Sequence, residues 1–318
     1  MLDTFLATLS PMVVMLICIA VGFILRKTKA APDNTAAVLS KLELNAFLPA
    51  TILRTFLTYC TVESITSRYS VVLFGTVATA LSVALAIPLG KLFSKEENEQ
   101  KIYRYSLMIA NYGFLGNAIV PAIMGEEGMY DYMLFCIPLN IVLYAWAINS
   151  LIPKGKVQQQ KGWKNLLNPV CISLFAGIVL GLLGVGKVIP GFVSTALNNL
   201  AACMGPVAML LTGFVIGGYH VPELLKNGRV YAVALLRLIV LPAVIVAVLW
   251  LLGADNSTLF MGMFAFSTAL GLNTVVVPAA YDGDTHTGAG MAMISHVGAI
   301  LTIPLLYAIL TMLVGGAG

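Results

Sequence analysis

The sequence has few charged residues and none of the catalytic motifs sought in it. Only 10% of its 318 residues are charged, whereas soluble domains carry about a quarter. The sequence contains no HExxH motif, no GxGD motif, no Ser–Lys protease pattern and no Walker A motif. These absences exclude the common intramembrane proteases and an ATP-driven machine of the Walker type. The predicted spans also lack the pair of central aspartates that a proton antiporter of this general architecture usually needs.

Cysteine is also scarce, and its spacing excludes a metal or redox site. The five cysteines are scattered, mostly within apolar runs, with no CxxC pair, so we interpret them as small buried hydrophobic residues. No metal site and no cofactor is predicted. The net charge of +4 is attributed to lysines in loops, and no nucleic-acid partner is expected. The first ten residues lack a basic segment and are interpreted as the start of a membrane span, not as a signal peptide.

Long apolar runs are abundant, and 59% of the residues are hydrophobic. Because a span takes roughly 20 residues, the chain accommodates ten spans with short connections. Backbone groups in lipid must be satisfied within their own segment, so the predicted fold class is all-α integral membrane. The predicted spans cover 3–25, 35–57, 66–92, 101–124, 130–151, 168–185, 192–218, 228–252, 257–281 and 285–313.

Lysine and arginine gather in alternate loops, which predicts the orientation of the chain. Basic residues follow spans 1, 3, 5 and 7, while the opposite loops carry mainly acidic residues. The loop after span 9 is an exception, since it contains Asp282 and Asp284 and no lysine. The basic side is predicted to be cytoplasmic. Ten spans then place both termini on the extracytoplasmic side of a plasma membrane protein.

Aligned prolines indicate two related halves. Pro49 and Pro206 are 157 residues apart, as are Pro121 and Pro278. The flanks agree in part, with AIVPAI at 118–123 against VVVPAA at 275–280. The predicted organisation is a first repeat at 1–151, a short cytoplasmic loop at 152–167 and a second repeat at 168–318. Because five is odd, the second repeat enters the membrane inverted, as is common in secondary transporters.

Spans 4 and 9, which correspond in the two halves, are interrupted near their centres. Helix-breaking and amide residues stand in SLMIANYGFLGNAIVPAIMG (106–125) and FSTALGLNTVVVPAA (266–280). The breaks are predicted at Gly113, Pro121, Gly271 and Pro278. Each break starts a half-helix near the midplane, and two converging helix N-termini favour an anion. Carbonyls at the ends of the first half-helices are an alternative site for a cation, and kinks made only for packing remain the third interpretation.

Polar side chains around these breaks are the candidate substrate ligands, at Asn111, Gly116, Asn117, Asn273 and Thr274. Pro49 and Pro206 are expected to kink helices beside the crossing, and Asn45 to face the cavity. Charges within spans are functional candidates. Arg237 is predicted either to hold a substrate carboxylate or to pair with an acid such as Glu43. Without that pairing, the Glu43 side chain is expected to extend to the end of its span. His296 is predicted to be either a neutral bonded histidine or a proton-linked switch.

Three segments carry a resemblance to a known family, LNAFLPATIL in span 2, ANYGFLGNAIVP in span 4, and TALGLNTVVVP with the following YDGD in span 9. On these segments the chain resembles a bacterial member of the auxin efflux carrier family, relatives of the plant PIN carriers. The resemblance covers the whole chain and implies a fold like that of bile acid–sodium symporters, in a homodimer. It implies a scaffold of spans 1, 2, 6 and 7 and a transport domain of spans 3–5 and 8–10. The family's binding asparagine falls on Asn111.

The chain departs from the family pattern at Ala118, where the family often has proline, and at Gly271 and Leu272, where many bacterial members have paired prolines. The resemblance implies export or exchange of a small organic anion such as an auxin-like or malate-like carboxylate, by an elevator-type movement. A sodium-coupled organic anion symporter of the same fold is the alternative. A membrane sensor or channel is a third possibility from another class. The coupling ion, H+ or Na+, stays open.

Overall fold

The computed structural model describes residues 2–152, 162–279 and 285–315, and the regular elements in these ranges are all helices. The YDGD stretch at 281–284, which includes Asp282 and Asp284, and most of the predicted connecting loop lie outside the described residues. The helices of the first half are α1 (Leu2–Lys27), α2 (Thr35–Leu42), η1 (Glu43–Phe47), α3 (Leu48–Tyr59), α4 (Val62–Ser67), α5 (Tyr69–Phe93), α6 (Glu97–Met108), η2 (Tyr112–Gly116), α7 (Asn117–Phe135), α8 (Ile137–Val142), η3 (Leu143–Ala147) and α9 (Ile148–Ser150).

The second half contains a comparable series of helices. They are η4 (Gly162–Leu166), α10 (Pro169–Leu182), η5 (Val185–Lys187), α11 (Gly191–Gly217), α12 (Val221–Leu224), α13 (Gly228–Leu235), η6 (Leu236–Val240), α14 (Leu241–Leu251), α15 (Asn256–Ser267), α16 (Asn273–Ala279) and α17 (His286–Gly315). Four of the short elements, η1, η2, η3 and η6, are wide π-helical turns that lie within longer helices or at their start.

Six continuous helices are long and apolar enough to cross a membrane, and they cover Phe5–Lys27, Thr35–Tyr59, Tyr69–Phe93, Gly191–Gly217, Gly228–Leu251 and His286–Gly315. A seventh is added if Tyr112–Phe135 and Ile137–Ser150, bent by 47° against each other, form one span. The all-helical membrane fold is confirmed. Ten uninterrupted spans are not observed in the described residues, because predicted spans 4 and 9 are each broken and the α10 helix has only 14 residues.

Helix ends follow ordinary capping rules. The Asn168 side chain accepts hydrogen bonds from the backbone at the start of α10, and the Asp255 side chain does so at the start of α15. Pro49 lies in the first turn of α3, directly after the π-helical turn η1. The helix is continuous over Thr35–Tyr59, so the proline removes one intrahelical hydrogen bond, and the wide π-helical turn directly precedes the position of that loss. Helix α7 is kinked at Gly125, whose φ is +74°.

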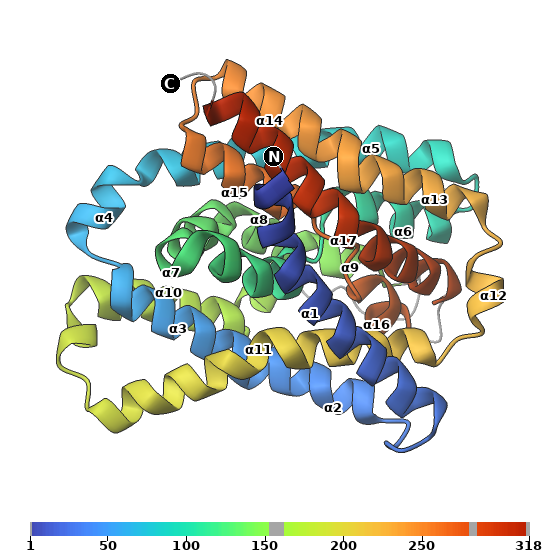
Figure 1. Cartoon of the computed structure of the whole chain (residues 1–318), viewed down its shortest axis with the longest axis horizontal. Helices are drawn as coiled ribbons and strands as arrows, with labels where there is room; N and C mark the ends of the chain where they lie inside the picture. Colours follow the sequence, from blue (N-terminus) through green and yellow to red (C-terminus); the bar gives the residue numbers. More distant parts are fainter. Residues whose placement is uncertain (1, 153–161, 280–284, 316–318) are drawn as a thin grey trace.

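The helices pack as two groups (Figure 1). In one group, α1 and α3 pack against α11, and α3 also packs against α10. In the other, α5 packs on α6 and α14, and α17 packs on α13 and α15. Helix α7 touches both groups through α3, α5 and α15, and α1 contacts α17. The segments between the two groups therefore lie at the boundary where a site between them would form.

Glycines allow the closest of these helix contacts. A Cβ atom at Gly213 of α11 would lie 1.8 Å from the Ile19 carbonyl oxygen of α1, and one at Gly22 would lie 2.1 Å from the Leu210 carbonyl oxygen. The two backbones thus touch directly, as small residues permit in membrane helix pairs. Helices α1 and α11 consequently form a tight pair.

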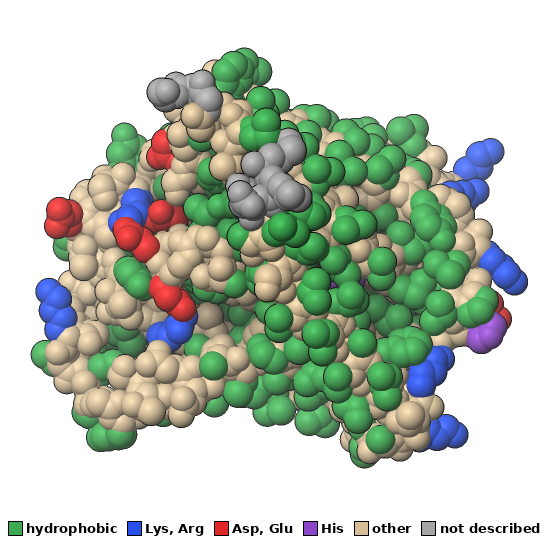
Figure 2. All heavy atoms as spheres, in the orientation of Figure 1, with side chains coloured by type: hydrophobic (Ala, Val, Ile, Leu, Met, Phe, Trp, Pro, Cys, Tyr) green, Lys and Arg blue, Asp and Glu red, His purple; other side chains and the backbone are tan. Residues whose placement is uncertain are grey.

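Charged side chains gather toward the two ends of the long axis, with hydrophobic side chains across the middle (Figure 2). At one end Arg54 pairs with Glu126, and Arg68 pairs with both Glu127 and Asp131, the latter at 2.6 Å. A middle zone of exposed apolar side chains between two charged ends is the pattern expected of a protein in a bilayer.

Candidate functional site

Two extended segments cross at the centre of the molecule, each in the gap of a broken helix. Helix α6 ends at Met108 and η2 begins at Tyr112, while α15 ends at Ser267 and α16 begins at Asn273. Ala110 and Leu270 form an isolated antiparallel bridge, and the Asn111 N–H donates to the Ala269 carbonyl at 2.7 Å. Each segment therefore supplies hydrogen-bond partners for backbone groups that the break in the other helix leaves unpaired. A break inside a membrane requires such partners.

Neighbouring helices hold the flanks of both breaks by side-chain hydrogen bonds to the backbone. Ser82 of α5 donates to the Met108 carbonyl at 2.9 Å, Arg237 Nη1 donates to the Leu107 carbonyl at 2.8 Å, and Ser295 Oγ of α17 accepts from the Leu270 N–H at 2.9 Å. The last carbonyls of α6 are thus already occupied. The crossing is a fixed structural unit supported from three sides.

Asn111 lies in this crossing with its side chain 4% exposed. Its Nδ2 lies 3.2 Å from His296 Nε2, and His296 Nδ1 lies 2.7 Å from the Ala292 carbonyl. Because a carbonyl only accepts, Nδ1 carries the proton, and Nε2 of the neutral ring accepts from the amide. The amide oxygen and the second N–H of Asn111 are not used by this bond. This geometry fits the interpretation of His296 as a neutral, bonded histidine.

Asn273 begins α16 on the other side of the crossing. Its Nδ2 donates to the Tyr105 hydroxyl at 2.8 Å, and its side chain is half-buried. Thr274 is fully buried, and its hydroxyl donates to the Gly271 carbonyl at 3.0 Å. Asn273 therefore has polar groups left for a ligand, whereas the Thr274 hydroxyl serves the local turn.

A cavity of ≈ 80 Å³ lies against the crossing, and its polar lining includes Asn111, Asn140 and Asn273. Gly113 and Gly271 also line it, and a Cβ atom at Gly113 would meet nothing within 4 Å. The backbone of η2 is thus open toward the cavity at this point. The structure brings Asn111, Gly113, Gly271 and Asn273 together, as the sequence predicts for two breaks that meet.

The rest of the cavity lining is mostly apolar, and only its η1 and α3 part comes from the group of α1, α3, α10 and α11. Leu44 of η1 and Leu48 of α3 form part of it, together with Leu143, Tyr144 and Ile148 from η3 and α9. None of the described residues that line the cavity is acidic. A space with amides on one side, apolar groups on the other and no fixed negative charge suits a small anion with a hydrocarbon part.

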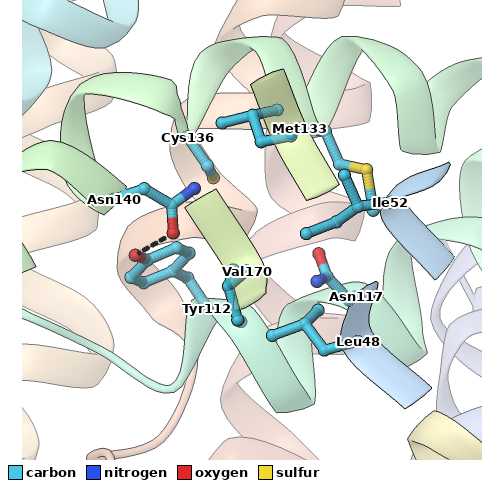
Figure 3. A pocket seen from close by; sticks show the side chains of 10 residues that line it. Leu48, Ile52, Tyr112, Asn117, Met133, Cys136, Asn140 and Val170 are labelled. Carbon is cyan, nitrogen blue, oxygen red and sulfur yellow. Dashed lines mark hydrogen bonds between the residues drawn. The ribbon is translucent and has the colours of Figure 1, made fainter. Parts of the chain in front are cut away.

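A second, smaller cavity of ≈ 30 Å³ adjoins the first (Figure 3). It is lined by Asn117 and Cys136, and it shares Leu48, Gly113, Tyr112 and Asn140 with the larger cavity. The Tyr112 hydroxyl donates to Asn140 Oδ1 at 2.9 Å, as the dashed line in Figure 3 marks. The Tyr112–Asn140 pair therefore borders both cavities.

Several predicted site residues lie elsewhere. Asn45 is exposed and donates to the Lys41 carbonyl of its own helix at 2.7 Å, so its amide does not face the cavity. Gly116 is buried, and a Cβ atom there would lie 2.0 Å from the Tyr132 hydroxyl. Gly116 is therefore a packing position in this structure. The lining of the two cavities includes Asn117 but not Gly116 or Thr274.

The two charged candidates also differ from expectation. Arg237 is fully buried and stacks on Phe266 with 5.5 Å from guanidinium to ring centroid, but it does not line either cavity. Glu43 is fully buried too, so the expectation that it reaches the span end is wrong. No ion pair joins Arg237 and Glu43 in the described part of the chain, because their elements pack against different helices.

The predicted helix-breaking prolines are all inside helices or at their start. Pro121, Pro206 and Pro278 lie within α7, α11 and α16, and Pro49 lies in the first turn of α3. None of the four lines either of the two cavities described above. The crossing itself is formed by the segments before η2 and α16, where asparagine and glycine stand.

The sequence reasoning missed Asn140 and the tyrosines of the site. Asn140 is an amide in the otherwise apolar stretch CIPLNIVLY at 136–144, a signal of the kind used for Asn111. Tyr105 and Tyr112 are buried polar side chains that bond to Asn273 and Asn140. Buried hydroxyls usually have a hydrogen-bond partner. Tyrosines close in sequence to the predicted amides therefore indicated that their hydroxyls belong to the site.

A family model described as membrane transport protein, the family of the auxin efflux carriers, matches residues 7–161 and again residues 154–307. The chain belongs to this family. The resemblance found from the residues of spans 2, 4 and 9 is thereby confirmed, and the protein is a membrane transporter of a family that is not an enzyme family. A comparison with curated proteins gives no match.

Proposed function

We propose that this transporter moves a small organic anion, an auxin-like or malate-like carboxylate, as a secondary carrier. The observation that carries the proposal is the cavity at the crossing, where Asn111 and Asn273 retain polar groups for a ligand and no acidic side chain is present among the described lining residues. Amide N–H groups donate to a carboxylate without adding fixed charge. Charge-assisted hydrogen bonds of this kind are about twice as strong as neutral ones.

A buried positive charge near the crossing also favours an anion over a cation. Arg237 bonds to the Leu107 carbonyl at the end of α6, and its Nε and Nη2 have no partner in the described residues. A guanidinium without a nearby acid contributes a positive potential to the surrounding low-dielectric region. The Leu107 and Met108 carbonyls at the end of α6 already accept hydrogen bonds from Arg237 and Ser82, which makes them weaker ligands for a coupling cation. Arg237 thus acts on the substrate through its field and its hold on α6.

The proposed movement is an elevator-type shift of one helix group against the other. The scaffold comprises α1, α2 with α3, α10 and α11, and the transport domain comprises the helices around α5–α9 and α13–α17. Two observations support this division. The cavity has walls from both groups, and its ≈ 80 Å³ is small beside ligand pockets of about 300–1,000 Å³. A substrate larger than a few atoms therefore requires the Leu44–Leu48 wall to move away from the crossing.

The architecture that we propose has ten crossings in two inverted repeats of five. The support is the pair of breaks, one per half, at Ile109–Asn111 and Thr268–Leu272, together with the two family matches of similar length. We further propose a plasma membrane location with both termini extracytoplasmic, which the loop charges support, and a homodimer, which the family resemblance supports. The acidic end with Glu126, Glu127 and Asp131 is the extracytoplasmic one.

The test is a ligand screen on the purified protein, followed by flux in proteoliposomes. Each of indole-3-acetate, malate and malonate is paired with its fully methylated ester (the dimethyl ester for the two dicarboxylates), which is similar in shape but lacks the negative charge. A binding carboxylate at 100 times its Kd stabilises the folded state by about 2.7 kcal/mol and raises the Tm, while its ester has no such effect. Equal shifts by acid and ester would refute anion recognition. Uptake that requires a sodium gradient would favour the sodium-coupled symporter instead.

A further inference from the structure

A glutamate carboxyl lies buried, without a hydrogen-bond partner, in the helix that contributes Leu44 and Leu48 to the cavity lining. Glu43 begins the π-helical turn η1, its side chain is 0% exposed, and neither Oε1 nor Oε2 has a hydrogen-bond partner in the described residues. An acidic residue is almost never fully buried unless it is paired. This group therefore requires an explanation that the rest of the site does not supply.

The elements packed against η1 offer no counter-ion. They are α2, α3, α10 and α11, and their titratable or charged side chains are Lys41, Arg54, Tyr59, Cys171 and Cys203. Lys41 is exposed and Arg54 pairs with Glu126. Cys203 donates to the Asn199 carbonyl of its own helix, and Cys171 is bonded by Asn168. No hydrogen bond or ion pair from Tyr59, or from any of the others, to Glu43 is present in the described residues.

An ionised carboxylate in such a place costs several kcal/mol of desolvation that no partner offsets, whereas a neutral carboxyl avoids most of this cost. A metal ion would need several oxygen ligands, and the described residues form no acidic or histidine cluster that would hold one. We infer that Glu43 is a proton-binding site of the transporter, occupied in this conformation, and that its proton moves with the carboxylate substrate. The second half of this inference rests on the proposed function.

Glu43 is connected to the cavity wall through η1 itself. The next residue, Leu44, lines the cavity, and so does Leu48. The Leu48 N–H donates to the Glu43 carbonyl and closes the π-helical turn. Loss of the proton leaves a charge that must reach water, which requires η1 to turn and to carry Leu44 and Leu48 with it. Water on the open side receives the proton, and water on the other side supplies the next one.

Infrared difference spectroscopy tests proton binding without any substrate. The full chain in lipid is measured at neutral pH in H2O and D2O, as wild type, Glu43→Gln and, as a matched control, Glu63→Gln at an exposed position of α4. A buried protonated carboxyl has a C=O stretch that is separate from that of a carboxylate and shifts in D2O. We expect this band in wild type and Glu63→Gln and its loss in Glu43→Gln. A band that persists in Glu43→Gln, or no band in wild type, would overturn the proton site.

Malate flux into proteoliposomes tests the coupling. Wild-type flux is expected to change with an imposed pH gradient by up to about tenfold per pH unit, the limit for one titrating proton. Glu43→Gln is expected to abolish this dependence, while Glu63→Gln retains it. An unchanged pH dependence in Glu43→Gln, or sodium dependence that the variant removes, overturns the coupling. If wild type moves no malate or other carboxylate at all, the proposed function fails, but the infrared result still decides whether Glu43 binds a proton.

Discussion

Replacing Asn111 with alanine removes one amide from the cavity and leaves the crossing of the two backbones in place. The bond that holds the crossing is made by the Asn111 main-chain N–H to Ala269 at 2.7 Å, which alanine retains. The side chain loses its 3.2 Å contact to His296, which costs about 1 kcal/mol of folding stability. One hydrogen bond to a charged ligand contributes about 1.5–3 kcal/mol. The Kd for a carboxylate should therefore rise by roughly 10- to 150-fold.

The assay is titration of the carboxylate with the largest Tm shift against purified wild type, Asn111→Ala and Asn45→Ala. Asn45 has the same side chain but is exposed and bonded to its own helix, so its variant should keep the Kd within about twofold, well below the loss of one hydrogen bond. Size-exclusion profiles and the Tm without ligand show that each variant is folded. Equal Kd values for Asn111→Ala and wild type, or an equal loss in both variants, would show that the cavity at the crossing is not where the carboxylate binds.

Three further predictions concern stability and helix packing. Gly116→Ala places a Cβ atom 2.0 Å from a tyrosine hydroxyl, whereas the Cβ atom of Gly113→Ala meets nothing within 4 Å. Gly116→Ala should therefore lower the free energy of unfolding by about 1–3 kcal/mol, and Gly113→Ala should not. The Tm values of the two variants in detergent make the comparison. Arg237→Met leaves the carbonyl at the end of α6 without its donor and should cost about 1–3 kcal/mol; an unchanged Tm would show that this bond does not hold α6. The half-exposed Arg54–Glu126 pair joins α3 to α7. A double-mutant cycle with alanine at each position should give a coupling free energy of about 0.2–1 kcal/mol. A larger value would show that this ion pair holds the two helix groups together more strongly than an exposed pair does.

Local sequence features are sufficient to predict the membrane class and the position of the crossing. Long apolar runs exclude a soluble fold whatever their packing. Asparagine and glycine in the middle of two apolar spans mark breaks, because these residues weaken a helix locally. Asn111 and Asn273 line the same cavity because each stands beside a break and the two breaks meet. These predictions depend on local composition and on the spacing of the two halves, both of which can be read along the chain.

Which faces of the helices meet the cavity depends on helix geometry and on packing between distant segments. Asn45 lies four residues before Pro49, and in a regular helix the two would share a face. The π-helical turn at Glu43–Phe47 adds a residue to one turn and rotates that face by about 100°. Asn45 is consequently exposed, Glu43 is buried and Leu44 lines the cavity. Asn140 joins the site because its amide oxygen accepts a hydrogen bond from the Tyr112 hydroxyl, a contact between separate segments that no local pattern encodes.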